Sequence, residues 1–144
     1  METQNYSNHA KYVPAYHIWT FLLLVLTFGG AVTNLVKSLG DHQRLYSAAL
    51  LVALSLVVFS IFFFCRIFAL KAQDRAIRAE ENLRHYVLTG KLLDPRLHTL
   101  QVVALRFASD DEFPALAREA AEKGMTPREI KQAVKNWRAD HYRV

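Results

Sequence analysis

Two long stretches of the chain carry no charged residue: IWTFLLLVLTFGGAVTNLV at residues 18–36 and YSAALLVALSLVVFSIFFFC at residues 46–65. They are nineteen and twenty residues long. An α-helix rises ~1.5 Å per residue, so either stretch, as a helix, matches the ~30 Å hydrocarbon core of a bilayer. Buried helices of soluble domains are seldom so long and so apolar twice in succession. The two stretches therefore predict a transmembrane hairpin.

The polar residues gather after this hairpin. Residues 66–144 hold 15 of the 18 Lys and Arg and 11 of the 13 Asp and Glu. A polar unit of this length is near the lower limit for forming a stable hydrophobic core by itself, so we expect it to pack against the hairpin or against neighbouring copies of the chain. We predict an N-terminal interfacial segment at 1–16, a transmembrane hairpin at 17–70, and a cytoplasmic helical extension with a helical domain at 71–144.

The distribution of cationic residues predicts the orientation in the membrane. Only Lys37 and Arg44 lie in the loop between the two apolar stretches, whereas Arg66, Lys71 and Arg75 open the segment after the second. Loops rich in Lys and Arg stay in the cytoplasm. We therefore expect a cytoplasmic C-terminus, and two spans return the N-terminus to the same side.

The second apolar stretch has no helix breaker at its polar end. Residues 46–89 contain neither Gly nor Pro, which predicts one helix that leaves the bilayer near Arg66 and stops at Gly90. Charges four residues apart, Asp74 with Arg78 and Glu80 with Arg84, would support its polar part. The overall prediction is an all-α fold in which a two-helix transmembrane hairpin, its second helix extended into the cytoplasm, precedes a small helical domain.

Three shorter helices are expected after Gly90. Asp94-Pro95 favours the start of a helix at residues 97–108. The apolar positions of that helix are Leu100, Val103, Ala104 and Phe107.

Two capping boxes predict the remaining helices. Ser109 to Glu112 precedes a helix that reaches about Lys123, with Gly124 as its stop; the late Pro114 allows a start one turn further on. Thr126 to Glu129 precedes the last helix. Its apolar face would comprise Ile130, Val134 and Trp137.

A seam of mostly small residues follows the long helix at alternating steps of four and three. Its members are Cys65, Ala69, Ala72, Ala76, Ala79, Leu83 and Tyr86. This spacing is that of a heptad seam, and small side chains let helices approach closely. We predict self-association just below the membrane; the alternative is that this seam packs on the C-terminal helices of the same chain.

Polar and small residues also line the first apolar stretch. Thr27 lies in this stretch, Gly30 and Asn34 share a helix face, and Gly29 and Thr33 lie on the neighbouring one. Asparagine is costly in lipid unless it finds a partner. We expect Gly30 and Asn34 to serve helix packing; the alternative is a polar strip that lines a pore.

The cations at the ends of the spans have two interpretations. Lys37, Arg44 and Arg66, together with Asn34, are candidates for a pore or its mouth. Such residues more often anchor helix ends by extending their charged groups into the headgroup region.

The sequence offers no constellation for catalysis, a cofactor or a metal. The histidines have no metal-ligand spacing, and neither a nucleophile triad nor a Gly-rich phosphate loop occurs. The cations of the last helix are interrupted by acidic residues, so we expect no nucleic-acid partner. We therefore predict that the chain is not an enzyme and needs no cofactor.

Several stretches together resemble a family of small bacterial membrane proteins that have a domain of unknown function. They are Gln4-Asn5-Tyr6, QDRAIRAEE at 73–81, ALRFASD at 104–110, Glu129-Ile130-Lys131, Asn136-Trp137 and Arg143-Val144. The resemblance implies a two-span protein of a bacterial inner membrane and brings no catalytic residue, cofactor or substrate.

These expectations leave three classes of function. The first is a non-catalytic, self-assembling membrane protein with a structural or accessory role. The second is a homo-oligomeric ion channel or pore, and the third is a membrane enzyme, for which no convergent polar site is evident. The expected partners are the lipid bilayer, further copies of the chain and, as an alternative, a larger membrane complex.

Overall fold

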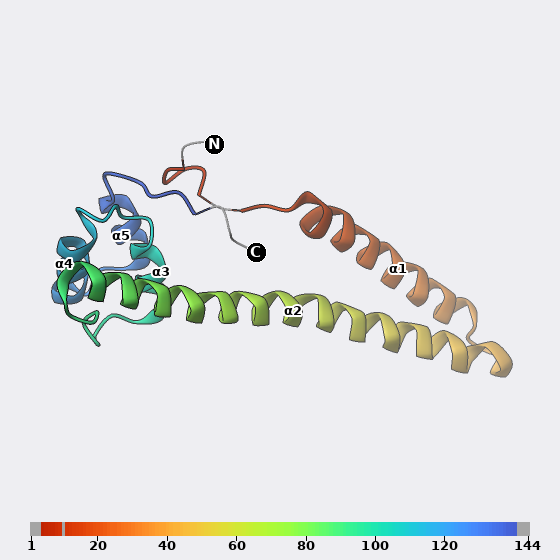
Figure 1. Ribbon diagram of the computed structural model, residues 1–144. Coiled ribbons are helices and arrows are strands. Elements are labelled where there is room, and N and C mark those ends of the chain that lie inside the picture. Colours follow the sequence, from red (N-terminus) through yellow and green to blue (C-terminus); the bar gives the residue numbers. More distant parts are fainter. Residues whose placement is uncertain (1–3, 10, 141–144) are drawn as a thin grey trace. The chain divides into compact units, whose positions relative to one another are not determined.

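The computed structural model describes residues 4–9 and 11–140, so Arg143-Val144, one stretch of the resemblance, lies outside the described residues. The elements are the π-helical segment η1 (Ala15–Thr20) and the helices α1 (Phe21–Lys37), α2 (His42–Thr89), α3 (Thr99–Leu105), α4 (Phe113–Lys123) and α5 (Pro127–Ala133) (Figure 1). In the described part of the chain the only extended pairing is an isolated bridge between Ala108 and Trp137. The all-α prediction is confirmed.

The chain forms two compact units. One comprises residues 12–68 and contains η1, α1 and the first part of α2; we call it the hairpin unit. The other combines residues 1–11 with residues 69–144 and contains the rest of α2 and α3 to α5; we call it the terminal unit.

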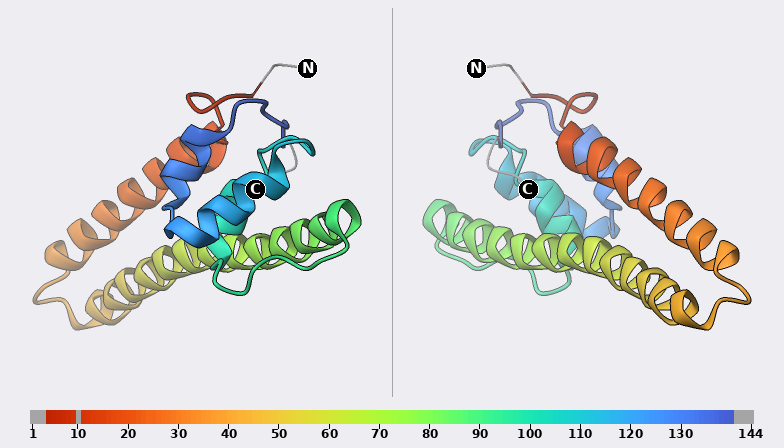
Figure 2. Two further views of the ribbon diagram at one scale, coloured as in Figure 1. Left: turned by 90° about the vertical axis from the view of Figure 1, so that its left-hand side faces the viewer. Right: turned by 90° about the vertical axis from the view of Figure 1, so that its right-hand side faces the viewer.

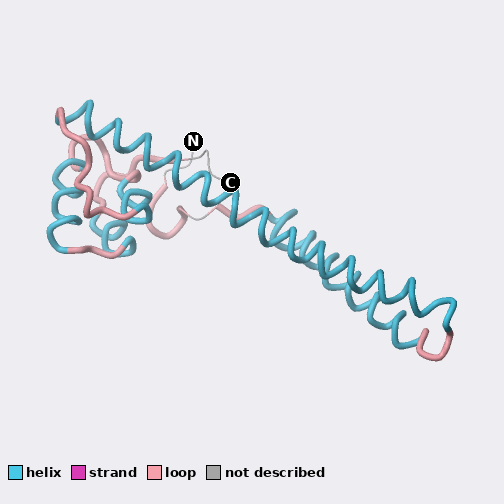
Figure 3. The backbone as a smooth tube through the Cα atoms, turned by 90° about the horizontal axis from the view of Figure 1, so that it is seen from below, coloured by secondary structure: helices cyan, strands magenta, loops and turns pink. Residues whose placement is uncertain are grey.

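Aromatic side chains of η1 and α1 contact α2 within the hairpin unit, in which a short loop joins α1 and α2 (Figure 3). The Phe59 ring of α2 makes edge contacts with Phe21 and Phe28, at centroid distances of 6.5 and 5.9 Å. The Tyr16 ring stacks on Phe62 at 4.4 Å, and its hydroxyl donates a hydrogen bond of 2.7 Å to the Phe62 carbonyl. This bond satisfies a phenol that would otherwise be costly in an apolar setting.

A tight loop connects the two helices. Gly40 adopts a φ of 95°, which favours glycine because it has no Cβ. Asp41 then opens α2, since its carboxylate accepts hydrogen bonds from the backbone N–H groups of Gln43 and Arg44 at 3.0 and 3.4 Å. A side-chain acceptor before the first turn satisfies amide groups that have no partner within a helix.

The long second helix is confirmed. It runs without a break for 48 residues and passes from the hairpin unit into the terminal unit (Figure 1). It ends where expected, because Gly90 takes a left-handed φ of 72° and its N–H bonds the Tyr86 carbonyl at 2.7 Å.

The terminal unit has a well-packed core. Its cluster of buried apolar residues comprises Leu97, Val102, Ala104, Leu105, Phe107, Ala108, Phe113, Leu116, Ala117, Ala120, Ala121, Ile130 and Val134. Helices α3 to α5 gather beside the last turns of α2, which contributes the buried Ile77 (Figure 2). The core is therefore built from short helices and the turns that join them.

The predicted helix at 97–108 is wrong at both ends. Asp94 and Pro95 form a turn instead, and His98 is the N-cap of the seven-residue α3. Leu100, expected in the core, is 55% exposed, whereas Gln101 is buried. The Gln101 amide is satisfied because it donates to the Met125 carbonyl at 2.7 Å and its oxygen accepts from the His98 N–H at 2.9 Å.

The two capping boxes have different outcomes. Thr126 and Glu129 form the predicted reciprocal bonds at the start of α5. Before α4 only the Glu112 half forms, at 3.4 Å from the Ser109 N–H, and the helix starts at Phe113, which places Pro114 in its first turn. Gly124 ends α4 in the left-handed conformation, as predicted.

Trp137 does not lie on the last helix, which corrects the predicted face. Helix α5 ends at Ala133, and Val134 is already extended. The chain then pairs with the turn after α3, where the Arg138 N–H bonds the Phe107 carbonyl at 2.7 Å. In this place the indole of Trp137 packs on Phe107 at a centroid distance of 4.9 Å.

Candidate functional site

The last turns of α2 turn a polar face towards the terminal core. Glu81 is 5% exposed, and the Arg84 side chain is 12% exposed. Glu81 and Arg84 form an ion pair of 2.9 Å, and Arg84 also pairs with Asp110 at 2.6 Å. The Arg84 guanidinium donates a further hydrogen bond of 2.7 Å to the Ala108 carbonyl.

This network replaces the charge pairs expected from spacing. Arg84 pairs with Glu81 rather than Glu80, and Arg78 donates to the Thr99 hydroxyl at 3.1 Å rather than to Asp74. The expected i,i+4 pairs are therefore wrong, because contacts with α3 and with the segment before α4 decide where these arginines point. Sequence spacing alone carried no signal for Asp110.

The predicted seam lies away from this polar face. Ala72, Ala76, Ala79, Leu83 and Tyr86 are exposed. Leu83 and Tyr86 expose 63% and 52% of their surface. The alternative in which the seam packs on the chain's own C-terminal helices is therefore wrong for these five residues. Of the other two members, Ala69 is half-buried and Cys65 is exposed in the hairpin unit.

The N-terminal segment is part of the terminal unit, which sequence reasoning missed. The Gln4 side chain pairs with the backbone of Asp140: its amide donates to the Asp140 carbonyl at 3.2 Å, and its oxygen accepts from the Asp140 N–H at 2.8 Å. The Asp140 carboxylate lies 2.8 Å from Nε of the buried Arg106. Gln4 and Arg106, which belong to two stretches of the resemblance, are thus both bound to Asp140.

His9 fixes the other end of this segment. Its ring lies 5.6 Å from Phe107 and 5.8 Å from Trp137. Its Nδ1 donates to the Tyr6 carbonyl at 2.7 Å, which leaves Nε2 to accept from the Lys131 ammonium at 3.1 Å. His9, near the start of the chain, and Trp137, near its end, therefore pack in one aromatic cluster with Phe107.

The polar residues of the first span border a groove within the hairpin unit. It has a volume of ≈ 340 Å³, and its lining includes Thr27, Gly30 and Asn34 from α1 and Ser55 from α2. Thr33 is satisfied within α1, where its hydroxyl donates to the Gly29 carbonyl at 2.8 Å. Asn34 is exposed, and its side chain makes no hydrogen bond to any described residue. A partner for this amide must therefore lie outside the described residues.

The candidate mouth residues do not form a cluster. Arg44 pairs with Asp41 at 3.4 Å and its side chain is 80% exposed. Lys37 lies in the last turn of α1, where a cation is favourable beside the free carbonyl groups of the helix end. Arg66 is half-buried on α2. Lys37 and Arg44 thus lie at helix ends, which suits anchoring, whereas Arg66 lies within α2. A role of these residues in permeation stays a prediction.

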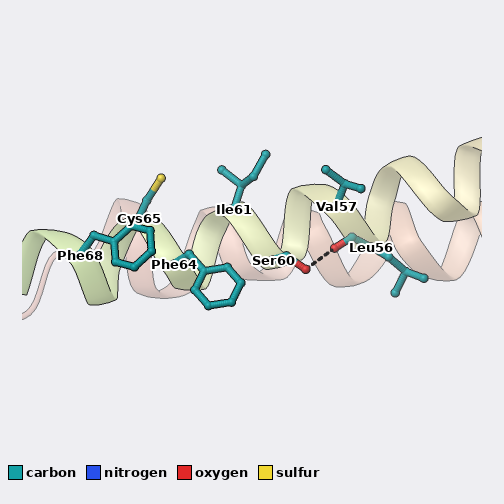
Figure 4. Close-up of a pocket in the computed structure, with 7 residues that line it drawn as sticks. All are labelled: Leu56, Val57, Ser60, Ile61, Phe64, Cys65 and Phe68. Carbon is teal, nitrogen blue, oxygen red and sulfur yellow. Dashed lines mark hydrogen bonds between the residues drawn. The ribbon is translucent and has the colours of Figure 1, made fainter.

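A second groove follows the apolar surface of α2. It is lined by Leu56, Val57, Ser60, Ile61, Phe64, Cys65 and Phe68 (Figure 4). Its single hydroxyl, on Ser60, donates to the Leu56 carbonyl at 3.0 Å and is satisfied within the helix. The groove therefore presents a mainly apolar lining.

The described residues contain no group of three or more His, Cys, Asp or Glu side chains that could hold a metal ion. Arg96 holds the pKa of Asp94 at about 2, chiefly through a side-chain hydrogen bond. Hydrogen bonds from Thr126 lower the pKa of Glu129. Asp94 is half-buried in a turn and Glu129 is exposed at a helix cap, and each is held by residues two or three positions away, so these shifts reflect local structure.

The geometry defines an all-helical protein with two helices long and apolar enough to cross a membrane. Over residues 1–144 the chain matches the family of unknown function DUF6526, and it belongs to this family. Comparisons with curated proteins and with solved structures found no match.

Proposed function

We propose that this chain is a non-catalytic, self-assembling integral membrane protein with a structural or accessory role. It anchors the terminal unit at the cytoplasmic face of a bacterial inner membrane. The observation that carries the proposal is the uncovered seam: residues 69–89 bury charged side chains and leave Ala72, Ala76, Leu83 and Tyr86 exposed. An apolar helix face that its own chain leaves uncovered is typical of an interaction surface.

Exposure in the hairpin unit supports the membrane part of the proposal. Leu23 and Leu26 of α1 and Leu54 of α2 each expose about 60% of their surface. The apolar window of α2 is only 11% buried, whereas the core helix of a soluble protein would be mostly buried. Lipid is the solvent that such a surface requires.

Contacts between the two ends of the chain support the topology. Gln4 bonds Asp140, and His9 packs on Phe107. If both apolar helices span the bilayer, these residues must lie on one side of it, as the cationic residues after Cys65 also indicate.

Topology is tested by labelling single cysteines in a Cys65→Ser background. Leu39, 66% exposed in the loop before α2, and Leu92, 64% exposed after α2, are matched positions of one residue type. An impermeant thiol reagent should label Leu39→Cys in intact spheroplasts and Leu92→Cys only after lysis. Labelling of both from the same side would contradict the hairpin.

Assembly is tested with Ala76→Trp on the seam and Ala115→Trp, an exposed alanine of α4, as the control. An indole does not fit where two helices approach closely, so Ala76→Trp should reduce the stoichiometry measured by light scattering in mild detergent. The control should match the wild type. A wild type that is monomeric at all concentrations would refute self-assembly.

A homo-oligomeric channel is the second candidate. Asn34 favours it, because this amide has no partner in the described chain and lies with Thr27 and Gly30 along one groove. Ion flux through wild-type protein in liposomes tests it directly. Flux at the level of empty liposomes would remove this candidate.

A further inference from the structure

The polar residues beside the seam define how a second copy can approach. With Ala69, Ala76 and Leu83 at heptad position a and Ala72, Ala79 and Tyr86 at d, Arg75 falls at g and Glu80 at e. Positions g and e flank the seam of a coiled coil and pair between helices. Arg75 and Glu80 are the only charged residues at g or e between residues 69 and 89.

The side chains of Arg75 and Glu80 are both accessible for pairing with another copy of the chain. Arg75 and Glu80 are exposed, and neither forms a hydrogen bond or ion pair with any described residue. The neighbouring charges differ in this respect, since Glu81 and Arg84 are committed to the terminal core and Arg78 bonds Thr99. The described residues thus leave Arg75 and Glu80 unpaired, on opposite flanks of the exposed seam.

We propose that the seam binds a second copy of the chain in a parallel, in-register coiled coil in which Arg75 of each copy pairs with Glu80 of its neighbour. In a parallel coiled coil a g residue faces the e residue five positions later on the adjacent helix. Arg75 and Glu80 have this spacing and opposite charges. Insertion in one membrane orientation makes the helices of two copies parallel, so this inference rests on the proposed function.

The apolar residues at the end of the seam fit the same arrangement. Val87 at the next e position is 75% exposed, beside Leu83 and Tyr86. The facing g residue, Asn82, is uncharged, and its side-chain oxygen accepts from the Leu93 N–H at 2.9 Å. The parallel register therefore places no like charges opposite each other and brings together the largest exposed side chains of the seam.

Charge reversal tests this register. Arg75→Glu would place Glu opposite Glu80, and Glu80→Arg would place Arg opposite Arg75. Each variant alone should raise the dissociation constant of the assembly roughly tenfold at low salt, because two attractive pairs become repulsive. The constants would be measured by energy transfer between labelled copies in liposomes of increasing lipid content.

Mixing gives the sharper result. Arg75→Glu with Glu80→Arg restores opposite charges at both contacts, so the two variants should assemble with each other in preference to themselves. The double variant, with both changes in one chain, should recover wild-type assembly. The differences should shrink in about 1 M salt, where the screening length is ~3 Å.

Controls separate this inference from the proposed function. Arg118→Glu and Glu122→Arg make the same charge changes at exposed positions of α4 and should leave assembly unchanged. If Ala76→Trp disrupts assembly and the charge reversals at 75 and 80 do not, the copies bind through the seam in another register. In that case the proposed Arg75–Glu80 pairing is wrong, while self-assembly through the seam stands. If Ala76→Trp has no effect, the proposed self-assembly through the seam fails as well.

Discussion

The two parts of α2 place opposite kinds of side chain on their exposed surfaces. Before residue 69 many exposed positions are large and apolar, as with Leu54 and Phe64, and the buried Ser55 and Ala48 are small. After residue 69 the buried positions include Glu81, while charged residues and the apolar seam share the exposed surface. The two parts of α2 therefore have different surroundings, and the surroundings of each part determine which of its residues are buried.

Replacing one phenylalanine in each unit gives the largest expected difference. Phe113 is fully buried in the terminal core, and the Arg84 guanidinium lies over its ring at 4.5 Å. Phe113→Ala should cost about 3–5 kcal/mol in the free energy of unfolding, through lost burial and an unfilled cavity. Phe64, 53% exposed beside the apolar groove, should cost much less because lipid or detergent fills its place.

Denaturant unfolding in mild detergent, followed by tryptophan fluorescence, measures both. Trp137 packs against the terminal core and reports the unfolding of the terminal unit, whereas Trp19 lies in the hairpin unit and reports on that unit. Equal losses in the free energy of unfolding for Phe113→Ala and Phe64→Ala would contradict this expectation. They would mean that the exposed surface of the hairpin unit is packed as tightly as the terminal core.

The second prediction compares neighbouring glutamates on the two faces of α2. Glu81→Ala removes the buried partner of Arg84 and should cost about 3 kcal/mol, since it leaves a largely buried cation with fewer acceptors. Glu80→Ala should stay within about 0.5 kcal/mol, as is usual for exposed positions away from such features. The same unfolding assay measures both variants. A larger loss of unfolding free energy for Glu80→Ala than for Glu81→Ala would mean that Glu80, and not Glu81, lies on the buried face of α2.

The third prediction concerns the attachment of the N-terminal segment. Gln4→Ala removes two hydrogen bonds to the Asp140 backbone and should weaken the local attachment by about 1–2 kcal/mol. Hydrogen exchange at the Asp140 amide should accelerate, while the amides of α4 keep wild-type rates. Lys11→Ala, an exposed position, is the control. Unchanged exchange at Asp140 would show that this contact does not hold the segment in solution.

Local signals in the sequence predicted the fold where one residue decides the structure. Gly90 and Gly124 end helices, and the Thr126–Glu129 box starts one, because a left-handed φ or a capping oxygen acts within a few residues. The unbroken α2 followed from the absence of Gly and Pro. The error at Trp137 arose because α5 ends at Ala133 and the chain then forms the bridge between Ala108 and Trp137. Leu100 does lie in a helix, but on the exposed face of α3.

The candidate site was predictable only on its exposed side. Heptad spacing identified the seam, but it gave no reason for Arg84 to select Glu81 and Asp110, since that choice depends on contacts 26 residues apart in the sequence. The docking of Gln4 on Asp140 joins residues 136 positions apart, and no periodicity carries such information. Long-range polar contacts of this kind are set by the assembled core.

Asn34 should give the smallest effect and the clearest separation between the two candidate functions. If its amide bonds a neighbouring copy, Asn34→Leu should weaken assembly by about 0.6 kcal/mol, because interhelical hydrogen bonds in membranes are individually weak. If it lines a water-filled axis, the same change should leave assembly intact and abolish ion flux, since a ring of leucines favours dewetting. Thr33→Val is the matched control, because that hydroxyl is already satisfied by Gly29. We expect the packing result; a conducting wild type whose flux is lost in Asn34→Leu at unchanged stoichiometry would make the channel the better proposal.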